Sequence, residues 1–404
     1  MSHSGASDSG SFRLSMLIND KRYRSYTFQL IAILAVAAMV AYLGSNLMSN
    51  LAAAGLNISY QFLGEPAGYD INQRLIEYNS QSSHWRAAVV GVLNTLLVAV
   101  VGCALATFFG VIAGVLRLSN NWLVSKIMAF YVEIFRNIPV LIWILMINAV
   151  FLVILPQPRD FRGETPEASM LFDAFAFTTR GVYLPKPLFN DGSGIVIATF
   201  ILSIIGAIAY RRYAKALLFA TGRLLPMAWP TWAIIFVPAI LVFFVMGQPI
   251  TLEYPALKGF NFQGGIHARV SYISLTFALA IYTGAFIAEN VRAGILAISK
   301  GQTEAAAALG LRSNRIMNLV VLPQALRVII PPMISNYLNL TKNSSLAIAV
   351  GYMDLTGTLG GITLNQTGRA IEAVLLLMAF YLAISLGISA LMNIYNNSIK
   401  LKER

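Results

Sequence analysis

The feature that most constrains this chain is a succession of long apolar runs separated by polar or basic connectors. A helix needs about 17–25 apolar residues to cross the hydrocarbon core of a bilayer. Backbone polar groups find no partners in lipid, so each run must form its hydrogen bonds within itself as a helix. We therefore expect an all-α polytopic membrane protein. The eight predicted spans are residues 26–47, 87–116, 122–155, 194–210, 229–246, 273–297, 328–350 and 371–395.

Composition agrees with this class and excludes others. Of the 404 residues, 57% are hydrophobic and only 11% are charged, which is too apolar for a soluble chain of this length. The net charge of +12 does not indicate nucleic-acid binding, because the basic residues form short clusters between the runs and no single patch. Under the positive-inside rule, these clusters and the even number of spans place both termini in the cytoplasm.

Cysteine and histidine usage gives no sign of catalysis or metal binding. Cys103 is the only cysteine and lies in an apolar run, so it cannot form an internal disulfide. His3, His84 and His267 are scattered through the tail and loops. We expect no cofactor, no metal site and no catalytic residues. An intramembrane hydrolase would need a nucleophile and base within the spans, and no span contains a His or an Asp pair.

The third run, residues 122–155, is too long for one straight span and is interrupted between Glu133 and Pro139. Two interpretations fit it: one span, or an interfacial or cavity-lining helix followed by a span after Pro139. Glu133 and Arg136 are three residues apart, a spacing at which they could simply pair on one helical face.

The seventh run, residues 328–350, is too polar for a lipid-facing helix, and Pro331-Pro332 interrupts it. Side chains this polar avoid hydrocarbon, so they should face the helix bundle or a wet cavity. They could line a solute pathway or form hydrogen bonds between helices. The candidate pathway residues are Ser335, Asn336, Asn339, Lys342, Asn343 and Ser344.

A polar stretch, residues 299–323, lies between the sixth and seventh runs. Ser299 and Gln302 have the spacing of a capping box, and Gly310 stands where a left-handed helix stop would fall, which predicts a helix of two to three turns. Glu304 is expected in its first turn, where the helix dipole favours an acid. Four consecutive alanines, residues 305–308, would let a partner approach closely.

The same stretch resembles the cytoplasmic loop of ABC-importer permeases. The pattern is Glu-Ala-Ala, a Gly, an aliphatic residue and Leu-Pro at fixed spacing, with Val320 where Ile is usual. In that family the short helix is the coupling helix that docks in a cleft of the ATPase subunit. The resemblance implies these ATPase-coupling residues: Gly301, Glu304, Ala305, Ala306, Gly310, Leu322 and Pro323.

Two further passages are similar to amino-acid permeases within that family: Glu133 to Pro139, and Leu340 to Leu346. An extra N-terminal span and an insertion are typical of the general L-amino acid branch. The resemblance implies a type I importer with a five-helix core. The expected parts are a tail (1–25), the extra helix (26–47), a periplasmic loop (48–86), the first core part (87–155), the insertion with two spans (156–270), the second core part (271–395) with its coupling loop (298–327), and a tail (396–404).

The chain has no Gly-rich Gly-Lys-Ser/Thr loop for ATP phosphates, so ATP must be hydrolysed on another subunit. The resemblance implies a permease of the bacterial inner membrane that carries L-amino acids with broad specificity, glutamate, glutamine, aspartate and asparagine among them. Its implied partners are an ATPase dimer, a second related permease in a heterodimer, a periplasmic binding protein and membrane lipid, and no nucleic acid. The alternatives are an ABC permease for an opine or polyamine, and an ion-coupled carrier, for which we find no inverted repeat.

Overall fold

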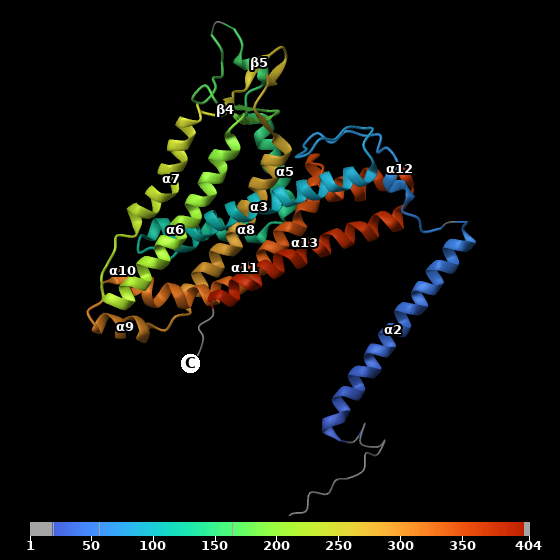
Figure 1. The fold of residues 1–404 in the computed structure, drawn as a ribbon. Coiled ribbons are helices and arrows are strands. Elements are labelled where there is room, and N and C mark those ends of the chain that lie inside the picture. Colours follow the sequence, from blue (N-terminus) through green and yellow to red (C-terminus); the bar gives the residue numbers. More distant parts are fainter. Residues whose placement is uncertain (1–17, 19, 56, 164, 400–404) are drawn as a thin grey trace, which may run out of the picture. The chain divides into compact units, whose positions relative to one another are not determined.

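The computed structural model describes residue 18 and residues 20–55, 57–163 and 165–399 (Figure 1). The chain divides after Gln61 into two compact units. The described part of the first unit consists mainly of helix α2 (Lys21–Ala53), whose apolar side chains are exposed. Most of the predicted N-terminal tail and residues 400–404 of the C-terminal tail lie outside the described residues.

Eight segments among the described residues are long and apolar enough to cross a bilayer, which confirms the number predicted from the sequence. The described chain is mostly helical, as expected. The helices of the second unit are η1 (Gln61–Gly64), α3 (His84–Leu116), α4 (Trp122–Asn137), α5 (Val140–Ile154), η2 (Pro158–Phe161), α6 (Ser193–Thr221), α7 (Ala228–Val245), α8 (Val270–Leu296), α9 (Lys300–Ala308), α10 (Ser313–Ile316), η3 (Met317–Val321), α11 (Leu322–Asn343), η4 (Ser344–Val350), η5 (Thr356–Thr363), α12 (Leu364–Thr367) and α13 (Ala370–Ile399).

The third apolar run is two helices, so the break before Pro139 that the second interpretation predicts is observed. Ile138, between α4 and α5, has extended backbone angles, as a residue before proline should. Helix α4 is not among the eight candidate spans, whereas the segment Val140–Phe161 is one of them, and α4 packs against α8. The Phe135 ring stacks on Trp143 with centroids 3.9 Å apart, which holds the two helices together across the break.

Helix α8 lies at the centre of the second unit and contacts α3, α4, α5, α11 and η4. Glycines let α3 approach it closely. A Cβ atom at Gly110 would lie 2.6 Å from Cβ of Ile287, and one at Gly114 would lie 2.7 Å from the carbonyl oxygen of Ala288. Small residues of this kind are how helices gain packing contacts where lipid removes the hydrophobic driving force.

The prolines of the seventh run do not interrupt it, contrary to expectation. Helix α11 continues through Pro331 and Pro332, and packing against α8 and α13 holds it together. The next connector, residues 351–369, has regular structure of its own. It contains the π-helical turn η5, and Asp354 is buried there, accepting hydrogen bonds from the Gly357 amide at 2.9 Å and the Tyr381 hydroxyl at 3.0 Å.

The insertion contains short β-strands where the sequence predicted only loops. Strands β1 (Ala176–Thr178), β2 (Gly181–Leu184) and β7 (Ile266–Arg269) form an antiparallel sheet in the order β1-β2-β7. Strands β5 (Ala256–Lys258) and β6 (Asn261–Gln263) form a hairpin. The β2–β7 pair leads into α8, so the sheet is anchored on the central helix.

The two inserted spans, α6 and α7, form a helical hairpin, packing mainly against each other. Its base is closed by strands β3 (Lys186–Phe189) and β4 (Ile250–Glu253), which pair antiparallel just before α6 and just after α7. The predicted span 194–210 ends too early, because the basic residues Arg211, Arg212 and Lys215 continue the same helix. All three lie in the last turns of α6, which extends to Thr221.

Candidate functional site

The first candidate site is the coupling helix α9, which lies at the end of the second unit opposite the strands (Figure 1). Its left-handed stop is confirmed: Gly310 has φ +77°, its amide donates to Ala307, and the Leu311 amide donates to Ala306. This is the Schellman arrangement that closes a helix C-terminus. Ala306 is buried, while Glu304, Ala305, Ala307, Ala308 and Leu309 are exposed. The helix therefore exposes a surface made largely of small residues.

Two details of the predicted helix start are wrong. Ser299 is the N-cap residue, but its side chain accepts no capping hydrogen bond, so there is no capping box. Because the helix begins at Lys300, Glu304 lies in the second turn and outside the strongest part of the helix dipole. Gly301 is exposed, with no atom within 4 Å of where a Cβ would stand.

Gln302, which the sequence assigned to a capping box, has a hydrogen-bond partner on another helix. Nε2 of Gln324 donates to Oε1 of Gln302 at 2.5 Å, and also to the carbonyl oxygen of Val320 at 2.9 Å. Gln324 follows Leu322 and Pro323, the first two residues of α11. The Leu-Pro end of the sequence motif therefore lies beside the coupling helix, although about 20 residues separate the two in the chain.

An ion-pair cluster lies where α8 meets the helices before the coupling helix. Glu289 pairs with Arg292 at 2.6 Å, and also with Arg117. Arg117 lies 3.8 Å from Glu133. The predicted pair between Glu133 and Arg136 is wrong, because the Arg136 guanidinium lies over the Phe286 ring, 5.3 Å from its centroid. The cluster joins α3, α4 and α8 at the end of α8 that precedes α9.

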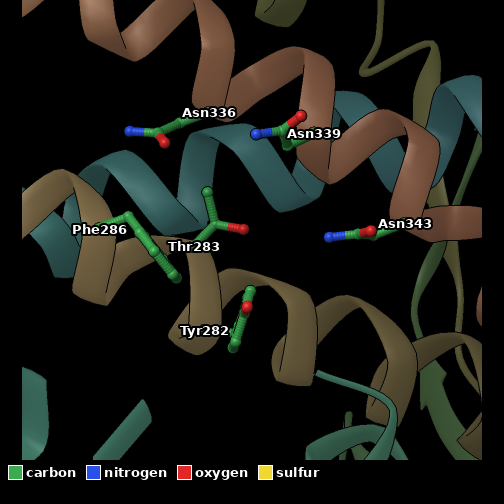
Figure 2. Close-up of a pocket in the computed structure, with 6 residues that line it drawn as sticks. All are labelled: Tyr282, Thr283, Phe286, Asn336, Asn339 and Asn343. Carbon is green, nitrogen blue, oxygen red and sulfur yellow. The ribbon is translucent and has the colours of Figure 1, made fainter. Parts of the chain in front are cut away.

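The second candidate site is a polar pocket of about 250 Å³ between α8 and α11, which we call the asparagine pocket. Figure 2 shows its three asparagines along α11 with α8 facing them. Nδ2 of Asn336 is buried without a hydrogen-bond partner among the described residues. An unsatisfied buried amide needs water or a ligand. The lining residues are Tyr282, Thr283, Phe286, Asn336, Asn339 and Asn343.

The structure brings together three of the six candidate pathway residues. Asn336, Asn339 and Asn343 share one face of α11, as their spacing predicted, and all three line the pocket. Ser335 and Lys342 are exposed and do not line it. Ser344 is buried, and its hydroxyl donates to the Thr341 carbonyl at 2.8 Å.

The opposite wall of the asparagine pocket was not found from the sequence. Tyr282, Thr283 and Phe286 belong to the sixth run, whose composition is that of an ordinary span. The three residues fit one face of a helix, because Phe286 follows Thr283 by three positions and Tyr282 by four. The same spacing occurs on lipid-facing surfaces, so it does not identify a pocket. The position of Arg136 over Phe286 places the interrupted third run next to this wall.

Comparison with known proteins supports this architecture. The family described as binding-protein-dependent transport system inner membrane component matches residues 217–401. The glutamate/glutamine/aspartate/asparagine transport system permease protein BztB of Rhodobacter capsulatus is 52% identical, covering 97% of each chain. The general L-amino acid permease protein AapQ of Rhizobium johnstonii is 43% identical over 98% of this chain and 96% of its own.

A third relative, the putative amino-acid ABC transporter permease protein YhdX of Escherichia coli, is 41% identical over the full length of both chains. A crystal structure of an amino acid ABC transporter with histidines aligns with 78% of this chain and 95% of its own, at 18% identity and a TM-score of 0.45. Eight spans and an inner-membrane transport family define a multi-pass membrane transport component. More particularly, the chain belongs to the amino-acid permeases of the ABC importers.

Proposed function

We propose that this chain is one of two related permease subunits of a bacterial inner-membrane importer that carries L-amino acids. Its range is broad, with glutamate, glutamine, aspartate and asparagine among the substrates, because the relatives named above carry these names. A separate ATPase dimer docks on α9, and a periplasmic binding protein delivers the solute at the opposite end of the helices. Both termini lie on the cytoplasmic side with α9.

The observation that carries this proposal is the order of three consecutive helices. Helix α9 is exposed and connects α8 to the α10–α11 segment, and α8 and α11 line the asparagine pocket. A partner that moves α9 therefore moves both walls of the pocket. We assign Glu304, Ala305, Ala306 and Gly310 to docking, and Leu322 and Pro323 to the attachment of α11.

The solute is expected to pass the asparagine pocket on its way between the two faces of the membrane. Amide groups both donate and accept hydrogen bonds, so Asn336, Asn339 and Asn343 can hold the ammonium and carboxylate groups of many amino acids without selecting one. A pathway residue must bind weakly enough to release the solute, and neutral amides meet that need better than charges. Lys342 and Ser335 lie outside this pocket and would act elsewhere on the route.

The test is ATP-driven uptake of a panel of labelled amino acids by the complete transporter in proteoliposomes, with an opine and a polyamine as competitors. Glu304→Lys and Gly310→Asp should keep ATP hydrolysis but lose uptake, because the first reverses the charge on the docking surface and the second adds a side chain that would spoil docking. Glu167→Lys, an exposed charge reversal in the insertion, is the control. Uptake driven by an ion gradient without ATP would contradict the proposal.

A further inference from the structure

A second polar pocket, of about 580 Å³, lies where the inserted sheet meets the core helices. Its volume is within the range of about 300–1,000 Å³ typical of small-molecule sites. We call it the arginine pocket, because Arg180 and Arg269 line it and, within the described chain, no aspartate or glutamate does. Its other lining residues are Asn148, Leu152, Thr179, Asn261, His267, Val270, Ser271, Val350 and Gly351.

The two arginines lie close together and have no acidic partner among the described residues. Arg269 is opposite Gly181 in the β2–β7 ladder, and the Val270 amide donates to the Arg180 carbonyl, so both arginines are at the same end of the sheet. Nε of Arg269 is buried and has no hydrogen-bond partner in the part of the chain that the structure describes. A buried guanidinium donor left unpaired is costly, and a carboxylate oxygen would satisfy it.

The wall beside the arginines is held in place by its own contacts. The His267 ring stacks on Tyr183 at 4.1 Å and 1°, and its Nε2 donates to the Arg180 carbonyl at 3.1 Å. The Tyr183 hydroxyl donates to Asn261 at 2.9 Å. Burial lowers the pKa of His267, so the ring is neutral near pH 7 and the positive charge of the pocket comes from the arginines. The N-terminus of α8, which begins at Val270, adds a positive helix dipole.

The arginine pocket and the asparagine pocket are lined by the same two stretches of helix. On α8, Ser271 lines the arginine pocket and Tyr282 lines the asparagine pocket. These two residues share one face of α8 and are about three turns, or roughly 16 Å, apart. On the other wall, Asn343 ends α11 and Val350 ends η4, the segment that follows it. Both pockets therefore lie along the same two segments of the chain.

We propose that the arginine pocket recruits acidic amino acids, with Arg180 and Arg269 binding their carboxylates before the solute enters the asparagine pocket. The inference rests on the proposed function, since it names a substrate class and an entry site for that transport. The pocket is built by the insertion and the core together, so the insertion contributes directly to substrate selection. Glutamine and asparagine, which carry one carboxylate, would bind there more weakly than glutamate and aspartate.

The experiment measures uptake of glutamate and glutamine by the complete transporter in proteoliposomes, each solute delivered by saturating loaded binding protein. Replacing both arginines by Gln should lower the glutamate-to-glutamine uptake ratio roughly tenfold, the effect of losing charge-assisted hydrogen bonds to a carboxylate. Arg269→Lys should restore part of the ratio because it keeps the charge. The matched control is Arg162→Gln, an exposed arginine of the same insertion.

Retained glutamine uptake shows that a variant is folded and assembled. An unchanged ratio in the double variant would overturn the inference while leaving the proposed function intact. An equal loss of both solutes, together with weaker binding of the binding protein, would also overturn it, because the arginines would then serve protein docking. Absence of any ATP-driven amino-acid uptake by the unaltered transporter would instead contradict the proposed function.

Discussion

Gln324 donates a 2.5 Å hydrogen bond to Gln302, and this contact joins the first turn of α11 to the coupling helix α9. The two residues lie on helices with different tasks in the proposed function: one receives the partner and the other lines the asparagine pocket. A displacement of α9 is thereby passed to α11 by a side-chain contact as well as by the connecting chain.

Gln302→Leu should reduce the number of solute molecules transported per ATP, because it removes the acceptor of this hydrogen bond. The expected loss is roughly two- to tenfold, which corresponds to one hydrogen bond of about 0.5–1.5 kcal/mol. Gln302→Glu keeps an acceptor oxygen at the same position and should behave like the unaltered protein. Uptake and ATP hydrolysis measured in the same proteoliposomes give the ratio, and an equal ratio in both variants would exclude a coupling role for the contact.

A cysteine at Asn339 should react with a water-soluble thiol reagent, since Asn339 lines the asparagine pocket. A cysteine at Lys342 should react as well, because the side chain is exposed, although outside that pocket. The background is Cys103→Ala, which removes the only native thiol. Thr341→Cys, at a buried position on the same helix, is the unreactive control. If the cysteine at position 339 reacted with the reagent in neither the resting nor the ATP-bound transporter, Asn339 would have only a structural role, in hydrogen bonding between helices.

Gly110→Val should destabilise the fold by about 1–3 kcal/mol, the usual range for overpacking an interior. The added side chain would meet Ile287, whose Cβ already lies 2.6 Å from the position of a Gly110 Cβ. Gly387→Val places the same side chain on α13, where no atom lies within 4 Å. The thermal unfolding midpoint in detergent should fall for the first variant only. Similar midpoints for both would mean that α3 and α8 tolerate separation.

Asp354 should make stability depend on pH. Burial raises the pKa of its carboxyl to about 6, above the value of about 3.9 expected in the unfolded chain. The folded state therefore holds the proton more tightly than the unfolded state. The contribution of Asp354 to the free energy of unfolding is greatest below about pH 4 and is lost as the pH rises through about 6. Asp354→Asn cannot ionise and keeps an acceptor for the Gly357 amide.

Relative to the unaltered protein, Asp354→Asn should gain stability on the order of 2 kcal/mol between pH 4 and pH 7. The measurement is the difference between the two thermal midpoints at pH 5 and at pH 8, which cancels the titration of other groups. The thermal midpoint of the variant, relative to that of the unaltered protein, should be higher at pH 8 than at pH 5. A difference that does not change with pH would show that Asp354 is ionised in the folded state.

Several local predictions failed for one physical reason: tertiary packing outweighs local sequence signals. Pro331 and Pro332 normally end a helix, yet α11 continues through them because α8 and α13 hold it in place. Gln302 has the spacing of a capping residue, but Gln324 is available as a partner. The strands of the insertion are three or four residues long, and the β2–β7 and β3–β4 pairs join segments far apart in the chain, which leaves little local periodicity to detect.

The sequence by itself determined the class of the protein, because the length of an apolar run and the cost of unpaired backbone groups in lipid allow only spanning helices. It also placed the short helix α9 and its left-handed stop at Gly310, since both depend on neighbouring residues. Only the tertiary structure decided which polar side chains meet. The asparagine pocket needs α8 opposite α11, and the arginine pocket needs the insertion beside the start of α8. These encounters join residues far apart in the chain, and packing alone selects them.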